Sequence, residues 1–328
     1  MAPRWAALLV GDSTRLTTAT PALTWASANP AVAQVDQRGV VRARARGFTS
    51  ITATFDSGSA VAGVVVAPPV LVGAGDIASC SYDDDAATAK LLDSIPGVVF
   101  TAGDDAYPYG SAADFSGCYD PTWGRHKART RPSLGNHDFR SGDGAAYYAY
   151  FGPVAGDPGL GYYSYDFAGW HIISLNSNVA MSAGSAQERW LRTDLSQHPA
   201  SCTLAYWHHP RFSSGTTHGS WAAPQPLWQA LYDAGADVIV VGHEHQYERF
   251  APQTPAGTLD TTRGIRQFVV GTGGAEFYPF GPAIANSEVR NNTTHGVIEL
   301  TLRAGGYDWA FVPVTGGTFT DSGSGRCH

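Results

Sequence analysis

Charged side chains are scarce in this chain of 328 residues, and positive charge is scarcer than negative charge. Asp, Glu, Lys and Arg make up 15% of the sequence, the formal net charge is -7, and the only lysines are Lys90 and Lys127. The one concentrated basic stretch, Arg42, Arg44 and Arg46, alternates with small apolar residues and fits the solvent face of a strand. No run of Lys or Arg offers the surface that a phosphate backbone needs. We therefore expect no nucleic-acid partner, although nucleotides are not excluded as substrates.

Long apolar runs are absent as well. No run approaches the roughly 20 residues that a helix needs to cross a bilayer. The first residues, MAPRWAALLVGD, contain a short apolar patch but neither a full hydrophobic region nor the cleavage site of a signal peptide. We therefore expect no transmembrane segment, and we interpret the chain as a mature sequence with an added Met.

Cysteine is rare and is not spaced for metal binding. None of the four cysteines has C-x-x-C spacing, so we do not expect a zinc-thiolate site. We favour pairing Cys80 with Cys118, because both lie in loops after strand-like runs. Cys202 opens a strand-like run and would pair with Cys327 near the end of the chain. This pairing implies an oxidising compartment, whereas four separate buried thiols are the alternative.

The sequence pattern divides the chain into two parts. Residues 8–66 contain neither His nor Cys and read as short alternating strands, for example Ile51, Ala53 and Phe55 set against polar neighbours. After Ala67-Pro68-Pro69, strand-like runs are separated by helix-like stretches at 84–94, 185–195 and 224–234. That order implies parallel pairing with right-handed crossovers. We predict one domain over 1–67 and a second, α/β, over 70–328.

Two details of the second part are also predicted. Residues 161–176 and 297–314 alternate like antiparallel strands of a second sheet. In the helix at 84–94, Ala86, Ala87, Leu91 and Leu92 are expected to share the buried face. The Asp83-Asp84-Asp85 cluster is expected to cap its start.

Five polar clusters hold the chemistry, and most of them end an apolar run. They are Gly75-Asp76, Gly103-Asp104-Asp105-Ala106-Tyr107, Gly135-Asn136-His137-Asp138, His208-His209-Pro210 and Gly242-His243-Glu244-His245. Sites in parallel sheets form beyond the carboxyl ends of the strands. Carboxylate, phenol, amide and imidazole groups suit hard or borderline metal ions, and two such ions about 3.5–4 Å apart can clamp a phosphate. The clusters therefore predict a site for two metal ions.

These clusters resemble the purple acid phosphatase branch of the metallophosphoesterases, in the calcineurin-like superfamily, over about residues 70–314. The motifs GDIA, GDDAY, GNHD, HHP and GHEH carry the resemblance. Most of the superfamily has Asp-x-His in the first motif, but this chain reads Asp76-Ile77-Ala78. The purple branch lacks that His and has a Tyr three residues after the second Asp, where Tyr107 stands. The resemblance implies a four-layer sandwich of two mixed β-sheets flanked by helices.

The resemblance also implies a role for each site residue. Asp76, Tyr107 and His245 would bind the first metal, Asp104 would bridge, and Asn136, His208 and His243 would bind the second. Phenolate ligation goes with Fe(III) at the first position, and the second would hold Fe(II), Zn(II) or Mn(II). His137 would bind phosphate and donate a proton to the leaving oxygen, and His218 would contact substrate from outside the metal shell. The family often has two histidines there, whereas this chain has Thr217-His218.

Other interpretations of single residues stay open. Asp76 and Asp104 could bind backbone N–H groups at strand ends, and Tyr107 could be a packing aromatic. We expect His209 to be structural, and Glu244 to point away from its two histidine neighbours if the segment is extended. The glycine-rich 271–274 segment lacks a following Lys, so we interpret it as a turn near the site and not as a P-loop.

The N-terminal segment LTWASANPAVAQVDQRGVVRARARGFTSITATF resembles bacterial Ig-like modules, which implies a small β-sandwich used for spacing or attachment. The whole chain is then predicted to be a secreted or extracytoplasmic bacterial hydrolase of small-molecule phosphate monoesters. The implied mechanism is in-line attack by a metal-bound hydroxide. A phosphodiesterase or nucleotidase on the same site is the alternative, because no motif separates these substrates. A surface adhesion protein is less favoured, because all seven candidate ligands are present.

Overall fold

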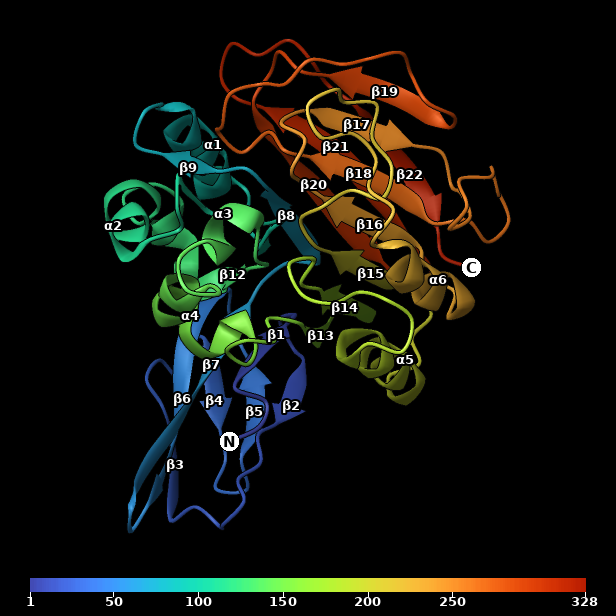
Figure 1. Ribbon diagram of the computed structural model, residues 1–328. Helices are drawn as coiled ribbons and strands as arrows, with labels where there is room; N and C mark the ends of the chain where they lie inside the picture. Colours follow the sequence, from blue (N-terminus) through green and yellow to red (C-terminus); the bar gives the residue numbers. More distant parts are fainter.

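The structure, a computed structural model, describes all 328 residues and begins with an all-β part (Figure 1). A three-stranded sheet in the order β2-β5-β4 and a four-stranded sheet in the order β1-β7-β6-β3 share one buried cluster, to which Val41 and Ile51 belong. The expected alternation holds in β6, where Ile51 and Ala53 are buried and Thr54 is exposed. The strands are β1 (Trp5–Leu8), β2 (Ser13–Arg15), β3 (Thr24–Ser27), β4 (Ala33–Val35), β5 (Val40–Ala43), β6 (Gly47–Phe55) and β7 (Gly58–Val66).

The α/β part contains two mixed sheets that pack face to face, as predicted. Their orders are β12-β10-β8-β20-β21-β22 and β13-β14-β15-β16-β18-β17-β19. The strands of the first are β8 (Val70–Ala74), β10 (Val98–Thr101), β12 (Thr130–Arg131), β20 (Gly296–Arg303), β21 (Gly306–Pro313) and β22 (Ser322–Arg326). Those of the second are β13 (Tyr163–Phe167), β14 (Trp170–Ser174), β15 (Thr203–Tyr206), β16 (Val238–Val241), β17 (Tyr247–Phe250), β18 (Arg266–Val270) and β19 (Ser287–Asn291). The segments 161–176 and 297–314 form antiparallel strand pairs, as expected, but not in one second sheet. The first pair lies in the seven-stranded sheet and the second in the six-stranded sheet, each beside parallel strands.

Alternate residues of the central strands explain the four layers. Val240 of β16 packs with Phe100 of β10 between the sheets, whereas Ile239 packs outward against Leu191 and Leu227 of the helices. Both faces of such strands are buried, which accounts for their continuous apolar runs. The remaining elements are β9 (Ala78–Ser79), α1 (Asp84–Ser94), β11 (Ala106–Tyr107), α2 (Ala112–Asp114), η1 (Phe115–Tyr119), η2 (Trp123–Arg129), α3 (Asn136–Phe139), α4 (Ala145–Phe151), η3 (Gly152–Ala155), α5 (Ala186–Gln197) and α6 (Gln225–Asp233). None of the helices is long and apolar enough to cross a membrane.

The predicted buried face of α1 is wrong in part. Leu92 is buried, but Ala86, Ala87 and Leu91 are only partly buried, and Asp85, Thr88 and Ala89 occupy the buried face instead. Thr88 donates a hydrogen bond to the backbone oxygen of Gly273, and Asp85 accepts one from Thr122. The acidic cluster makes no side-chain cap at the start of α1. Polar tertiary contacts therefore set the rotation of this helix, and an apolar pattern cannot reveal them.

Both expected disulfides are present. Cys80 is bonded to Cys118, and Cys202 at the start of β15 is bonded to Cys327 near the C-terminus. The second bond closes a loop of 125 residues and ties the last strand to the seven-stranded sheet. These bonds are compatible with an extracellular location.

The all-β part and the α/β part share a hydrophobic core. Trp5 of β1 lies over the guanidinium of Arg131, 3.4 Å from the ring centroid, and its ring meets that of Tyr165 edge to face. Trp5, Ala7 and Val65 belong to the same buried cluster as the strands of both large sheets. The two parts are therefore packed against each other and not merely tethered.

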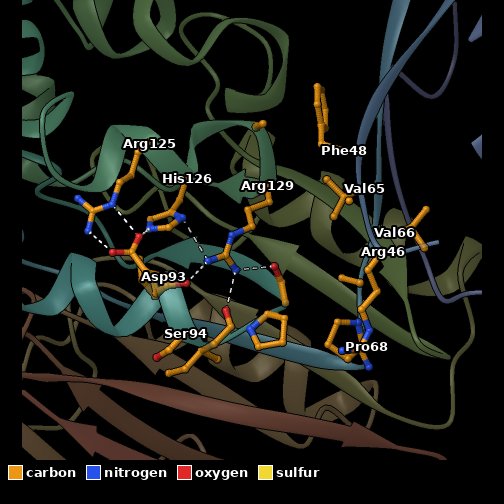
Figure 2. A pocket seen from close by; sticks show the side chains of 17 residues that line it. Arg46, Phe48, Val65, Val66, Pro68, Asp93, Ser94, Arg125, His126 and Arg129 are labelled. Atoms are coloured by element: carbon orange, nitrogen blue, oxygen red, sulfur yellow. Dashed lines mark hydrogen bonds and ion pairs between the residues drawn. The ribbon is translucent and has the colours of Figure 1, made fainter. Parts of the chain in front are cut away.

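A cavity of about 470 Å³ remains at this junction (Figure 2). Phe48, Val65 and Pro68 line it from the all-β part, while the end of α1 and η2 line it from the other side. Arg129 caps the C-terminus of α1 there, donating to the carbonyl oxygens of Ile95 at 3.0 Å and Gly97 at 2.8 Å. The cavity lies beside the beginnings of β8 and β10. The predicted metal ligands follow the ends of these strands, so the all-β part lies away from them.

A buried histidine in β14 gives the fold a pH-dependent contact. His171 Nδ1 lies 2.8 Å from Asp166 Oδ1, and its Nε2 lies 2.9 Å from Asp194 Oδ2. Burial by itself would lower the pKa of His171, but the hydrogen bonds to both carboxylates outweigh it and raise the pKa to about 9. Because the unfolded value is about 6.5, the protonated ring stabilises the fold below that pH, and this contribution is lost as the pH rises through about 9.

We therefore expect His171→Gln to destabilise the protein in a pH-dependent way. The raised pKa corresponds to about 3 kcal/mol, which solvent screening should reduce to about 1–2 kcal/mol. Urea unfolding of both proteins at about pH 6 and about pH 9.5 measures the difference in free energy of unfolding. That difference should shrink by this amount at the higher pH. A difference that stays constant with pH would show that His171 is not charged in the fold.

Candidate metal centre

The candidate ligands converge because four strands end at the same place. Asp76 follows β8 and Asp104 follows β10, and these two strands are parallel neighbours. His208 follows β15 and His243 follows β16, which are parallel neighbours in the facing sheet. Since the carboxyl ends of both pairs point to one edge of the sandwich, the side chains meet between the sheets. β11 supplies Tyr107, and the start of α3 supplies Asn136.

The backbone is strained at three of these positions. Asp76, Asp104 and His243 have φ angles of 59°, 53° and 73°. Residues with a Cβ rarely adopt this left-handed conformation, although Asp and His do so more often than most, and it marks positions held by their surroundings. Here it turns each side chain from the end of its strand into the space between the sheets.

Two glycines in the clusters lie so close to candidate ligands that a side chain would not fit. A Cβ on Gly135 would lie 2.0 Å from Asp104 Oδ1. Gly103 has a φ of 80°, and a Cβ there would lie 2.7 Å from the Cβ of His208. The glycines therefore let the second and third clusters pack directly against the candidate ligands.

Four side chains form the first half of the centre. The hydroxyl of Tyr107 lies 3.0 Å from Asp76 Oδ1, 3.1 Å from Asp104 Oδ2 and 3.1 Å from His245 Nε2. His245 Nε2 is also 3.4 Å from Asp76 Oδ1. Two carboxylates, a phenol and an imidazole thus face one point.

The second half is built around His208. Its Nε2 lies 3.0 Å from Asn136 Oδ1, 3.1 Å from His243 Nδ1 and 3.3 Å from Asp104 Oδ2. Asp104 Oδ2 therefore touches both halves, whereas Asp76 Oδ1 faces only the first. All seven predicted ligands are brought together.

Backbone carbonyls fix the orientation of two of the imidazoles. His208 Nδ1 is 2.9 Å from the carbonyl oxygen of Ala102, and His245 Nδ1 is 2.7 Å from that of Glu276. A ring nitrogen that donates to a carbonyl must carry the proton, so the other nitrogen can present its lone pair to a cation. Metal-binding histidines are commonly held in this way.

The electrostatics of the centre fit a cation. Asp76 and Asp104 are buried, and their only ionic partners are histidines. Burial would raise the pKa of Asp104, but His208 and His137 hold it below its usual value. The pKa of His208 is raised to about 9, because Asp104 outweighs the effect of burial. Burial, and then the two carboxylates, raise the pKa of Tyr107 well above its usual value. Buried carboxylates without Lys or Arg partners are the setting in which proteins hold metal ions.

The two predicted catalytic histidines lie at the opening of the centre. His137 Nε2 is 3.9 Å from Asp104 Oδ2, while its Nδ1 is 2.7 Å from the carbonyl oxygen of Pro108. The exposed ring of His218 stacks on that of His243 with centroids 4.0 Å apart. Both side chains can therefore reach a molecule that enters from solvent.

The alternative interpretations of single residues hold only in part. One oxygen of each aspartate does accept a backbone N–H, from His243 to Asp76 and from His137 to Asp104. The other oxygen of each faces the centre. Tyr107 packs against the ring of His137, yet its hydroxyl points into the cluster of ligands.

The ring of His209 packs beside those of His208 and His243. Its Nδ1 is 2.7 Å from Ser177 Oγ, and its ring lies 4.3 Å from that of His243. It makes no hydrogen bond or ion pair with either aspartate, although one of its ring nitrogens lies within 4.8 Å of those of His208 and His243. Its structural role stays a prediction. Burial, and then the charge of His208, lower the pKa of His209 to about 3.

Two aromatic residues near the centre were not predicted. Tyr278 stacks on His245 with centroids 3.8 Å apart, and Trp221 lies 4.6 Å from His209. Both lie in loops outside the clusters, Trp221 between the fourth and fifth and Tyr278 after the fifth, and no local motif marks them. The 271–274 turn does approach the centre, because a Cβ on Gly271 would lie 2.7 Å from Asp76 Oδ2.

Comparisons with known proteins agree with this geometry. Residues 70–247, more than half of the chain, match the family model of the calcineurin-like phosphoesterases. Residues 18–57 give a weak match to the immunoglobulin-like domain of intimin.

The chain is similar to purple acid phosphatase 15 of Arabidopsis thaliana, with 26% identity over an alignment of 211 positions that covers 53% of this chain and 40% of the plant protein. An uncharacterised protein of Mycobacterium tuberculosis (strain H37Rv) is 29% identical over 44% of this chain and 35% of its own length. The chain thus spans less than half the length of these relatives.

The solved structure of purple acid phosphatase PPD1 from yellow lupin seeds superimposes with a TM-score of 0.68 at 16% identity. The match covers 88% of this chain and 62% of the lupin protein. At this identity the likeness shows the fold alone. Together with the match over residues 70–247, it shows that this chain belongs to the calcineurin-like phosphoesterase family and is a homologue of the purple acid phosphatases.

Proposed function

We propose that this protein is a binuclear-metal phosphatase of the purple acid type that hydrolyses phosphate monoesters. The contact of Asp104 Oδ2 with Tyr107 on one side and His208 on the other carries the proposal. A carboxylate shared in this way is what a site for two neighbouring cations requires. Bound there, the cations would supply the positive charge that holds the phosphate and activates a water for in-line attack.

In this proposal the two halves of the centre hold different ions. Asp76, Tyr107 and His245 bind the first, Asp104 bridges, and Asn136, His208 and His243 bind the second. Phenolate oxygen favours Fe(III) at the first position, and the second takes Fe(II), Zn(II) or Mn(II). His137 and His218 act on the substrate, as proton donor and as phosphate contact respectively.

The iron assignment predicts a spectroscopic result. Oxidised protein should have a visible tyrosinate-to-iron absorption band, and Tyr107→Phe should abolish it because the phenolate oxygen is the only group removed. Absorption spectra of both proteins, with iron content measured alongside, provide the test. A band that is unchanged in the variant would refute the assignment of Tyr107 to iron.

The substrate class can be tested with two synthetic esters. We expect p-nitrophenyl phosphate to be hydrolysed with a higher kcat/KM than bis-p-nitrophenyl phosphate. Tyr109 and Trp221, both exposed, lie in the loops that border the opening and would contact the rest of the substrate. A preference for the diester would favour a phosphodiesterase on the same site. No hydrolysis of either ester by protein loaded with iron and zinc would overturn the proposed activity.

We further propose that residues 1–67 are an Ig-like module and residues 70–328 the catalytic domain, in a secreted bacterial protein. Two disulfides support an oxidising compartment. The module packs at the beginnings of β8 and β10 and away from the metal centre, which supports a spacing or attachment role. The proposed substrate is a small phosphoester.

A further inference from the structure

The segment that carries His243 and His245 has a second face. His243 and His245 face the metal centre, and Tyr247 continues that side into the core. The side chains between them, Glu244 and Gln246, contact the loop 213–219 instead. Glu244 thus points away from its histidine neighbours, although residues 243–246 are bends and not the extended segment on which that expectation depended. Glu248 follows on the same side. All three of these polar side chains are fully buried.

This second face holds the loop 213–219, which precedes α6 and carries His218. Glu244 Oε1 accepts the backbone N–H of His218 at 2.7 Å, and it also accepts that of Gly219. Further along, Gln246 Nε2 donates to Ser213 Oγ at 3.0 Å. Glu248 Oε2 accepts the backbone N–H of Ser214 at 2.7 Å. Three alternate residues thus fasten both ends of one loop.

The loop packs closely against the carboxylate of Glu244. A Cβ on Gly215 would lie 2.3 Å from the carboxyl carbon of Glu244, so the loop passes directly over the carboxylate. Glu244 Oε2 is buried and has no hydrogen-bond partner. Burying an unpaired oxygen destabilises a fold, so a residue that leaves one in place is expected to have a compensating role.

The contact fixes where the ring of His218 lies. Its backbone N–H is held by Glu244 Oε1, and its ring stacks on His243, the neighbour of Glu244 in sequence. His218 itself is exposed, and its ring also meets that of Tyr278 edge on, with centroids 5.6 Å apart. One short segment therefore sets both the metal ligands and the position of the histidine above them.

We propose that Glu244 is a positioning residue that acts through His218, by holding the 213–219 loop so that the imidazole lies over the phosphate site. The inference rests on the proposed phosphatase function for its kinetic consequence. The hydrogen bonds from two backbone amides to Glu244 do not depend on that function.

The kinetic test is a double-mutant cycle with p-nitrophenyl phosphate. Glu244→Ala should lower kcat/KM by roughly 10–100-fold, the range seen when groups that orient a metal site are removed. Glu244→Gln keeps an acceptor oxygen at the same place and should restore most of the activity. If Glu244 acts through His218, then Glu244→Ala should have little further effect in a His218→Ala background.

Metal content, measured on the same samples, separates this role from an effect on His243 and His245. Glu244→Ala should retain the wild-type amount of metal. Gly215→Ala is the second variant, because its methyl group displaces the Glu244 carboxylate while Glu244 itself is kept. It should reproduce the kinetic effect of Glu244→Ala. Effects of Glu244→Ala and His218→Ala that multiply, or loss of metal in Glu244→Ala, would overturn the proposal.

Amide hydrogen exchange tests the hydrogen bonds between Glu244 and the loop without any assay of activity. The amides of His218 and Gly219 should exchange slowly in the wild type, and at least about tenfold faster in Glu244→Ala. Glu299→Ala, on β20, is the control and should leave both amides protected. Fast exchange of both amides in the wild type would overturn the proposal. Slow exchange in a protein without phosphatase activity would reject the proposed function, but it would still support the hydrogen bonds from both amides to Glu244.

Discussion

Asp104→Asn should remove both metal ions from the protein and lower kcat/KM by at least roughly 10³-fold. Asp104 Oδ2 lies within 3.3 Å of both Tyr107 and His208. Loss of the carboxylate charge in Asn therefore weakens both halves of the centre. Two neighbouring cations repel each other, and a shared negative charge between them offsets that repulsion. A loss of about 4 kcal/mol of transition-state stabilisation corresponds to roughly this factor. Elemental analysis and steady-state kinetics of the purified variant provide the measurement.

Asp76→Asn is the matched control for this prediction. It makes the same chemical change at an equally buried carboxylate, whose Oδ1 lies against Tyr107 and His245. From the second half, Asp76 accepts only the backbone N–H of His243. We expect it to lose the first ion and to retain the second. Loss of a single ion from Asp104→Asn would contradict the bridging role. So would the reverse result, in which Asp76→Asn loses both ions and Asp104→Asn does not.

His137→Ala should slow hydrolysis of alkyl phosphates by about 10²–10⁴-fold, the usual contribution of a general acid. His137 Nδ1 is held by the carbonyl oxygen of Pro108, which leaves Nε2 directed to the opening of the centre. An alkoxide is a poor leaving group and needs a proton as the bond to phosphorus breaks. p-Nitrophenolate leaves without one, so p-nitrophenyl phosphate should lose roughly tenfold or less.

The dependence on the leaving group distinguishes proton donation from phosphate binding. His218→Ala provides the comparison, because a residue that contacts the equatorial oxygens should affect both esters by a similar factor. The measurement is kcat/KM for both esters with all three proteins at equal metal content. Equal losses for both esters in His137→Ala would reject the proton-donor role.

The convergence of the ligands could be predicted from sequence because it depends on a simple rule of sheet geometry. Asp76, Asp104, His208 and His243 each follow a run of buried strand residues, and parallel strands end at one edge. The four-layer fold was expected from the family resemblance; the continuous apolar runs agree with it, since they indicate strands that are covered on both faces. The disulfide pairing followed from the positions of the cysteines relative to those strands.

Contacts between distant segments could not be predicted in the same way. The rotation of α1 is set by Thr88 and Asp85, whose partners are Gly273 and Thr122. Tyr278 reaches His245 from a loop that carries no motif. Glu244 points away from its histidine neighbours, as an extended segment would require, but residues 243–246 are bends, and the loop that Glu244 holds could not be predicted. Such contacts depend on how segments far apart in sequence meet, which periodicity does not encode.

Metal analysis of the purified wild-type protein tests the central claim most directly. The account predicts two metal ions per chain, one of them iron, with both lost from Asp104→Asn. A wild-type protein that binds at most one ion per chain, when offered iron and zinc in excess, would contradict it.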